Sequence, residues 1–465
     1  MLLPYYKIII QQVTPYYYTN TNGVSNRIER NRTLILDFVA EFKIEKSWEK
    51  HTDTATLKLP KNIILETDEY FFKETGVFNV ILGGVVNDSE DGTPIRLAPL
   101  FLRGDMIEIT CGYRYKNEVG ESTFETNSLF KGYISKINST IPIEIECEDN
   151  FYLLKKTPIG LTRFPKDPND KNGTLYDLVK WIVKQTNNTI SQMSSLYPKL
   201  DYFKNIDSIT NRFSLGYLDI DYETMSCSMV LNHLRTKYGF ESYFIEDILY
   251  FGFPLNTDSD YKSDVNSVYE TNRAKSYGFF DFENNIIDSN LEYKNKEDIE
   301  LSTIVKCQTV TNGGQTLDGA TKTKREVKKV YVFWNKIKDG GSWDYIDLQN
   351  NKDIPANEGG ERHECIFPVG LNFKPPTVKN MFNLGISQLK KYYYTGFSGS
   401  FKTFIYPFVQ WNDNVNIISN QFADRNGQYK VKKVIYTAID GLSQEIFLDY
   451  KQQVKVPDFT EIYLI

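Results

Sequence analysis

One short polar stretch holds side chains of the types that act as an acid–base pair. Glu49, His51 and Asp53 alternate within one short polar stretch. A general base needs a pocket that shifts its pKa, whereas this stretch lies between two predicted strands. We therefore interpret it as a solvated turn, and we predict no catalytic residue here.

Histidine and cysteine do not occur with metal-binding spacing. His363 and Cys365 form a His-x-Cys pair, but two ligands without a second pair are too few for a zinc site. His233 lies in a predicted helix and is interpreted as a surface or satisfied core residue. The 5 cysteines are widely spaced, which indicates no disulfide framework. With no nucleophile-elbow, zinc-protease or phosphate-loop motif, we predict no enzyme activity, no cofactor and no metal.

The composition is typical of a large structured protein. The chain has 465 residues, of which 41% are hydrophobic and 14% aromatic. At about 100–200 residues per domain, this length predicts two to four domains. The net charge is -6, and the charges are interspersed without the basic stripe of a nucleic-acid-binding protein. No run approaches the roughly 20 apolar residues of a membrane span, and the apolar run near the N-terminus is a poor signal peptide.

Alternating apolar and polar residues predict strands at both ends of the chain. The predicted strands lie within residues 34–59, 105–110, 129–137, 141–147, 286–293, 299–309 and 403–451. The Gly-, Thr- and Lys-rich segment Gly313–Lys329 is predicted to be an exposed loop.

Apolar residues spaced three and four apart predict three helices. These are Thr174–Thr186, Thr224–Lys237 and Val378–Tyr392. A strand pair at Glu241–Phe244 and Ile248–Phe251 follows the second helix. The predicted secondary structure therefore changes along the chain from strands to an α/β insert and back to strands.

One predicted strand alternates acidic and apolar residues. The acidic residues are Glu144, Glu146 and Glu148, and the apolar ones are Ile143, Ile145 and Cys147. Such alternation is typical of a half-exposed antiparallel sheet. We interpret the glutamates as a wet surface rather than as an acid–base pair.

Two strand-rich blocks resemble each other. The paired stretches are Gly104–Ile109 with Asn412–Ile417, Gly132–Ile137 with Tyr429–Val434, and Ile143–Cys147 with Glu445–Leu448. The repeat positions are Asp105, Tyr133 and Ile134 in the first block, and Asp413, Tyr429 and Val431 in the second. One explanation is that all antiparallel meanders share alternation. The other is a duplicated barrel, which lets three subunits close a quasi-sixfold ring.

These stretches, in this order, resemble the tail and baseplate hub family of tailed phages. That family includes the late control protein D group, the T-even baseplate hub and the first part of the valine–glycine-repeat spike proteins of type VI secretion. The resemblance is carried by Leu57–Pro60, Gly104–Ile109, Phe130–Ile134, Ile145–Asn150, Gly396–Phe401, Pro407, Asn412–Val415 and Gly427–Val431. Asn412 departs from the usual glycine, but asparagine tolerates the same left-handed backbone.

The resemblance implies a mainly β fold with an α/β insert: two tube-protein-like antiparallel β-barrels, a helical insert and a connecting helix. The expected domains are a first barrel at 1–154, the insert at 155–280, the start of the second barrel at 281–329, a mixed or loop region at 330–375, and a helix with the closing strands of the second barrel at 376–465.

The resemblance also implies a function. A homotrimeric hub of this kind has pseudo-sixfold symmetry, surrounds an axial channel and joins the tail tube to the spike or tip. The expected partners are tail tube or tape-measure proteins, a separate spike or tip protein, and phage DNA that passes without specific binding. The expected location is the virion tail, assembled in the host cytoplasm. Glu144, Glu146 and Glu148 are then candidate channel-facing residues, whose negative potential would keep DNA from sticking.

Two other functions remain open from the sequence. Abundant tyrosine and tryptophan would suit a receptor- or glycan-binding tail protein, although the tryptophans are spread over different modules. A tail-associated cell-wall hydrolase is the second alternative, and the lack of a paired His/Cys or an isolated carboxylate dyad argues against it.

Overall fold

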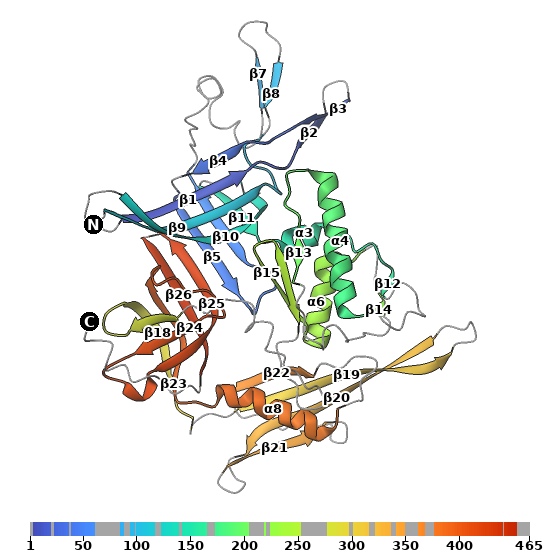
Figure 1. Cartoon of the computed structure of the whole chain (residues 1–465), viewed down its shortest axis with the longest axis vertical. Coiled ribbons are helices and arrows are strands. Elements are labelled where there is room, and N and C mark those ends of the chain that lie inside the picture. Colours follow the sequence, from blue (N-terminus) through green and yellow to red (C-terminus); the bar gives the residue numbers. More distant parts are fainter. Residues whose placement is uncertain are drawn as a thin grey trace.

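The computed structural model describes most of the chain. The described residues are 3–19, 23–36, 39–60, 84–87, 94–97, 99–116, 122–138, 142–164, 173–203, 218–219, 224–252, 277–296, 301–315, 321–335, 341–348, 361–367, 376–439 and 441–452. Strands from both ends of the chain join in one 13-stranded sheet (Figure 1). This mainly β architecture with a helical insert agrees with the predicted fold class.

Two groups of strands make up the large sheet. Module 1 runs in the order β4 (Thr33–Leu36), β1 (Leu3–Gln11), β9 (Met106–Lys116), β10 (Ser122–Asn138), β11 (Ile143–Glu148), β6 (Thr54–Leu59) and β5 (Glu41–Ser47). Module 2 runs in the order β17 (Tyr277–Asp281), β24 (Asn414–Ile418), β25 (Gly427–Ala438), β26 (Leu442–Lys451), β23 (Gly396–Phe404) and β18 (Ile286–Lys294).

Each module curls on itself like a barrel. In module 2 the end strands β17 and β18 are joined by the short turn 282–285, so the ends of the strand path must approach each other. In module 1 only four residues of sequence separate the end strands β4 and β5. In each module, the two strands at opposite ends of the strand order are consecutive in sequence and only a few residues apart. The ends of the sheet must therefore lie close together, so neither module can be flat.

The two modules have the same strand order. Each strand of module 2 has a counterpart in module 1. The strands β17, β24, β25, β26, β23 and β18 correspond, in this order, to β4, β9, β10, β11, β6 and β5. Strand β1 is an addition between β4 and β9, antiparallel to both. β4 therefore runs parallel to β9, as β17 runs parallel to β24.

The insert packs helices and a hairpin into a core of its own. Its helices are α3 (Phe151–Lys156), α4 (Leu175–Met193) and α6 (Cys227–Tyr238), and its strands are β12 (Arg163–Phe164), β13 (Asp201–Tyr202), β14 (Leu218–Asp219), β15 (Glu241–Ile245) and β16 (Ile248–Gly252). Helix α4 begins at a capping box, in which Thr174 and Asp177 each accept a hydrogen bond from the other's backbone N–H. The helix pattern of Thr174–Thr186 is thus confirmed, and the helix continues two turns further.

A separate four-stranded sheet corrects part of the expected second barrel. Its order is β21 (Ser342–Asp347), β20 (Thr321–Asn335), β19 (Leu301–Gln315) and β22 (Glu361–Phe367), and helix α8 (Val378–Tyr392) packs on it. The sequence predicts residues 301–329 in the second barrel and Gly313–Lys329 in a loop, but 301–315 and 321–329 lie in strands β19 and β20 of this separate sheet. Alternation of apolar and polar residues predicts a strand but not the strand with which it pairs. A mostly polar strand shows no such alternation, so it is easily predicted as a loop.

The remaining described strands form two hairpins, β2 (Tyr16–Thr19) with β3 (Ser25–Ile28) and β7 (Gly84–Asn87) with β8 (Pro94–Leu97), and a short 3-10 helix, η2 (Ala423–Arg425), precedes β25. Within residues 66–99, a segment whose role the sequence leaves open, the structure describes 84–87, 94–97 and 99. Among the described helices, none combines the length and apolarity that crossing a membrane requires.

Candidate functional site

A tight turn leads into β9 in module 1. Gly104 N donates to Ile134 O at 2.8 Å, and Ile134 N donates back to Asp105 O at 2.9 Å. The Asp105 carboxylate closes the turn by accepting from Leu102 N at 2.8 Å. Gly104 has φ 96°, a conformation that glycine adopts without steric cost.

Module 2 contains the same turn before β24. Asn412 N donates to Val431 O at 2.8 Å, and Val431 N donates to Asp413 O at 3.0 Å. The Asp413 carboxylate accepts from Gln410 N at 2.8 Å. Asn412 has φ 70°, so it takes the left-handed conformation of Gly104. The repeat positions Asp105 and Asp413, and likewise Ile134 and Val431, thus occupy equivalent places.

The equivalence continues into the following strands. The pairing of β10 with β11 shifts register after Ile134, and that of β25 with β26 shifts after Val431. A bulge at the same place in both modules re-aims the strand in the same way. Alternation alone would not produce matching turns and matching bulges, so these features favour duplication over chance similarity.

The two repeat tyrosines are not equivalent, because Tyr133 lies beside Ile134 whereas Tyr429 lies two residues before Val431. Tyr133 is buried against the insert, with its ring 5.7 Å from that of Tyr152. Tyr429 is buried inside module 2, where its hydroxyl accepts from Phe397 N at 2.9 Å. Tyr133 therefore attaches the insert, and Tyr429 holds the start of β23.

A buried ion pair distinguishes the turn of module 1. The Arg30 guanidinium contacts both Asp105 carboxylate oxygens at 2.8 Å, and the two side chains are only 3% and 0% exposed. Arg30 also donates to the carbonyls of Thr14, Pro99 and Leu100. Bidentate charge-assisted hydrogen bonds of this kind are strong, and they also fix the relative orientation of the two side chains. Arg30 was not singled out from the sequence, where it is one cation among many.

The candidate acidic residues lie on the half-buried face of β11, while Ile143, Ile145 and Cys147 are buried. Each glutamate has a polar neighbour: Glu144 accepts from Asn138, Glu146 from Lys136 and Asn138, and Glu148 from Lys155. The Lys136 ammonium lowers the pKa of Glu146. Two of the three glutamates therefore have a cation beside them: Lys136 on β10 for Glu146, and Lys155 on α3 of the insert for Glu148.

The two modules meet edge to edge. The second half of β25, Lys433–Ala438, pairs antiparallel with β5, and Lys433 Nζ lies 3.2 Å from Glu45 Oε1 across this seam. Phe42 and Ile44 on β5 and Tyr436 on β25 are buried in a core that extends through both modules. We call this β5–β25 contact the intrachain seam.

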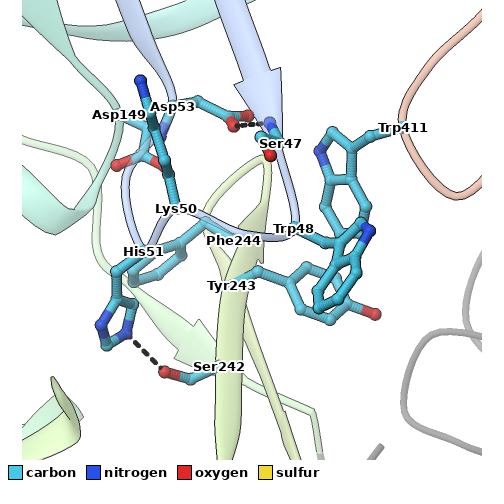
Figure 2. A pocket seen from close by; sticks show the side chains of 10 residues that line it. All are labelled: Ser47, Trp48, Lys50, His51, Asp53, Asp149, Ser242, Tyr243, Phe244 and Trp411. Carbon is cyan, nitrogen blue, oxygen red and sulfur yellow. Dashed lines mark hydrogen bonds between the residues drawn. The ribbon is translucent and has the colours of Figure 1, made fainter. Parts of the chain in front are cut away.

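Three parts of the chain meet below the seam (Figure 2). The loop after β5 contributes Trp48 and His51, β15 contributes Ser242 and Tyr243, and module 2 contributes Trp411. His51 Nε2 lies 2.8 Å from Ser242 Oγ, and the His51 ring packs on Phe151. Glu49 and Lys50 are exposed, as a solvated turn requires, but His51 and Asp53 are not, so that interpretation was wrong for these two. Tertiary contacts with the insert cover them.

This junction lacks the geometry of a hydrolase. The polar partners of His51 are the Ser242 hydroxyl and the Asn232 amide, whereas a Ser–His–acid triad needs a carboxylate on the second ring nitrogen. The enclosed cavity measures about 10 Å³, roughly the space of a single water. Asp149 lies on the cavity wall, and burial together with the Asp53 charge raises its pKa. These side chains hold the insert against the barrels.

His51 should make the stability of the protein depend on pH. Burial, and then the Arg235 charge, lower the His51 pKa from 6.5 to about 4. The folded state therefore disfavours a proton that the unfolded state binds, and stability falls as the pH drops from 6.5 towards 4. We expect wild type to lose up to about 3 kcal/mol relative to His51→Gln over this window, measured by urea unfolding at pH 7.5 and 4.5.

The comparison with His51→Gln is needed because carboxyl groups titrate with the opposite sign. Burial raises the Asp449 pKa to about 6 and also raises the Asp149 pKa. The folded state therefore binds these protons more readily than the unfolded state, and their binding raises the free energy of unfolding as the pH falls. A difference between wild type and His51→Gln that stays constant with pH would refute the role of His51.

The other sequence candidates lie apart from this junction. His233 lies on α6, and His363 pairs in register with Thr303 on β19. In the described part of the chain, no three His, Cys, Asp or Glu side chains group as metal ligands. All five cysteines are free and buried, and burial raises the pKa of the Cys227 and Cys365 thiols to about 12. Thiols with such pKa values are unreactive.

Two pairs of tryptophans come together in the fold, one within a hairpin and one between distant segments. Trp334 and Trp343 have ring centroids 5.0 Å apart, and Tyr393 packs on both. Trp48 and Trp411 both line the junction. The sequence showed them as dispersed because strand pairing, rather than spacing, brings them together.

An apolar groove lies between the modules on the side of the β25–β26 hairpin. Its volume is about 1010 Å³. Exposed apolar side chains line it, namely Ile287, Phe404, Tyr406 and Ile439. Apolar patches of this kind are uncommon on monomers and are typical of surfaces that meet another molecule.

No family model and no curated protein matches the sequence. Among solved structures, the tail protein from Neisseria meningitidis MC58 is 10% identical, with 96% of this chain and 97% of that chain covered and a TM-score of 0.43. The 43 kDa tail protein of prophage MuSo2 from Shewanella oneidensis is 12% identical, with 94% and 97% covered and a TM-score of 0.42. The half-lidded Francisella PdpA–VgrG complex is 9% identical, with 98% and 60% covered and a TM-score of 0.40.

Proposed function

We propose that this chain is a structural hub of a phage tail or a related contractile injection system. The observation that carries the proposal is the duplication itself: two barrel-like modules with the same strand order and the same Asp-closed turn, joined edge to edge. A protein with two like modules can offer like surfaces at two positions of one ring.

Three chains would then close a ring of six modules. Point-group rings form when a head-to-tail contact repeats with a rotation that closes. The ring would surround an axial channel and join a sixfold tube to a threefold spike or tip. The groove with its exposed apolar side chains supports a role in assembly, because such surfaces are usually covered by another molecule.

The proposed partners follow from that position: tail tube or tape-measure proteins on one side, a spike or tip protein on the other, and DNA that passes without specific binding. The proposed location is the virion tail. The closed junction at His51 and Ser242, where the cavity is about 10 Å³, supports a non-enzymatic role.

Light scattering on the purified protein is the first test. We expect a mass near three times 54.0 kDa that persists through dilution in the micromolar range. A mass of one chain across the whole concentration series would contradict a ring that assembles from this chain alone.

A further inference from the structure

The intrachain seam defines how one module joins another. Across it, Val434 lies opposite Lys46 and Ile435 opposite Glu45. The Lys433–Glu45 ion pair crosses it diagonally, and both side chains are largely covered, at 23% and 15% exposure. The seam uses the edge of β25 that becomes available where β24 ends, because β24 pairs only with residues 427–430.

Strand registers identify the counterpart of β25 in module 1. Ile134 corresponds to Val431 through the shared turn, and the shared bulge follows. Lys136 then takes the place of Lys433, and Ile137 that of Val434. β9 pairs with β10 only as far as Tyr133, so the same edge becomes available at Lys136–Asn138.

The counterpart of β5 follows from three further registers. In module 1, Ile137 lies opposite Ile145, Ile145 opposite Leu57, and Leu57 opposite Phe42. In module 2, Val434 lies opposite Ile446, Ile446 opposite Phe401, and Phe401 opposite Ser289. Ser289 therefore corresponds to Phe42, and Glu292 corresponds to Glu45. Lys58 with Glu41 and Lys402 with Asp288 occupy matching cross-strand places, which supports the alignment.

Both counterpart edges lack a neighbouring strand in the described part of the chain. β18 ends the sheet and pairs only with β23, and it lies on the outside of module 2 at the lower left of Figure 1. Lys136–Asn138 pairs only with β11. The side chains there are exposed, 59% for Lys136 and 49% for Tyr293. Open strand edges are sites where another chain can add to a sheet.

We propose that β18 of one copy pairs antiparallel with Lys136–Asn138 of the next copy and so repeats the intrachain seam between subunits. This proposal rests on the hub function and names its subunit contact. Lys136 and Glu292 would form the intersubunit counterpart of the Lys433–Glu45 pair, and Ile137 would face Tyr293. Lys294 falls opposite Lys136, but its ammonium lies over the rings of Tyr392 and Tyr394, 5.9 and 5.3 Å from their centroids.

Engineered cysteines test the register directly. Residues directly opposite each other in an antiparallel pair have Cβ atoms about 4.5–5.5 Å apart, within reach of a disulfide after small adjustment. The double variant Ile137→Cys/Tyr293→Cys should give covalent multimers up to a closed trimer on non-reducing gels. All five native cysteines are buried, so background cross-linking should be low.

Two matched variants control this experiment. Val434→Cys/Lys46→Cys places cysteines at the equivalent positions of the intrachain seam and should cross-link within one chain. Ile137→Cys/Asn290→Cys moves one cysteine three residues out of register, and we expect at least about tenfold less intersubunit product.

A charge exchange tests the ion pair independently. Glu292→Lys would place two ammonium groups together, and repulsion of at least about 1.4 kcal/mol would weaken assembly about tenfold. The exchange Lys136→Glu/Glu292→Lys should restore assembly in part, because it also removes the cation beside Glu146. Glu29→Lys, at a side chain that is 70% exposed on the β3 side of module 1, is the control and should leave the mass unchanged.

The outcomes separate the contact from the function. A trimeric mass together with in-register cross-links supports both. A trimeric mass with no more cross-linking in register than out of register overturns the proposed contact and leaves the hub function standing. A single-chain mass at every concentration, with no cross-links between chains, overturns both.

Discussion

Replacing Asp105 by alanine is expected to lower the free energy of unfolding by about 3–5 kcal/mol. The Arg30 guanidinium is 3% exposed and has Asp105 as its carboxylate partner, so the variant leaves a buried charge uncompensated. The turn also loses the acceptor of Leu102 N. Urea unfolding at neutral pH, followed by circular dichroism, measures this loss.

The control for this variant is an exposed ion pair. Glu29 lies 2.7 Å from Arg27, and the two side chains are 70% and 47% exposed, so Glu29→Ala should change stability by no more than about 1 kcal/mol. Adding Arg30→Met to Asp105→Ala should recover part of the loss, because the uncompensated charge is then removed. A loss below about 1 kcal/mol for Asp105→Ala would mean that the buried pair contributes little beyond its hydrogen bonds.

Replacing Phe401 by alanine is expected to lower the free energy of unfolding by about 3–5 kcal/mol. Its ring is 1% exposed and lies 5.0 Å from that of Phe280. Leu57, its counterpart in module 1, is also fully buried, and Leu57→Ala should lower stability by about 2–5 kcal/mol. Because one core extends through both modules, both variants should shift the same cooperative transition.

Phe404 serves as the matched control, since it lies on the same strand but is 53% exposed. Phe404→Ala should change stability by about 0.5 kcal/mol or less. Two resolved transitions, with Leu57→Ala shifting one and Phe401→Ala the other, would show that the modules unfold separately. The continuous core across the seam would then contribute little.

The repeat was visible in the sequence because its signals are local. Alternation marks each strand, and an Asp after a residue that tolerates positive φ marks the turn before it. Asn412 could be recognised as standing for Gly104 on these grounds, and both have positive φ. The helix of Val378–Tyr392 was equally predictable, since Met381, Leu384 and Leu389 form one buried face.

Long-range pairing was not predictable in the same way. Residues 301–329 were recognised only in part as strand, and their partners β21 and β22 are distant or polar. His51 was read as solvent-exposed because nothing nearby in sequence indicates that β15 covers it. Arg30 gave no signal, because a buried ion pair consists of two ordinary surface-type residues until the fold encloses them.

The sequence by itself determined the type of each strongly periodic element, the likeness of the two meanders and the positions of the Asp residues that close the turns, because these depend on residues within one strand or one turn of each other. The tertiary structure alone decided which strands join across the seam, which charges are buried and which edges stay open. Those features depend on contacts between segments hundreds of residues apart, such as Glu45 with Lys433, and periodicity within a segment carries no information about its distant partner.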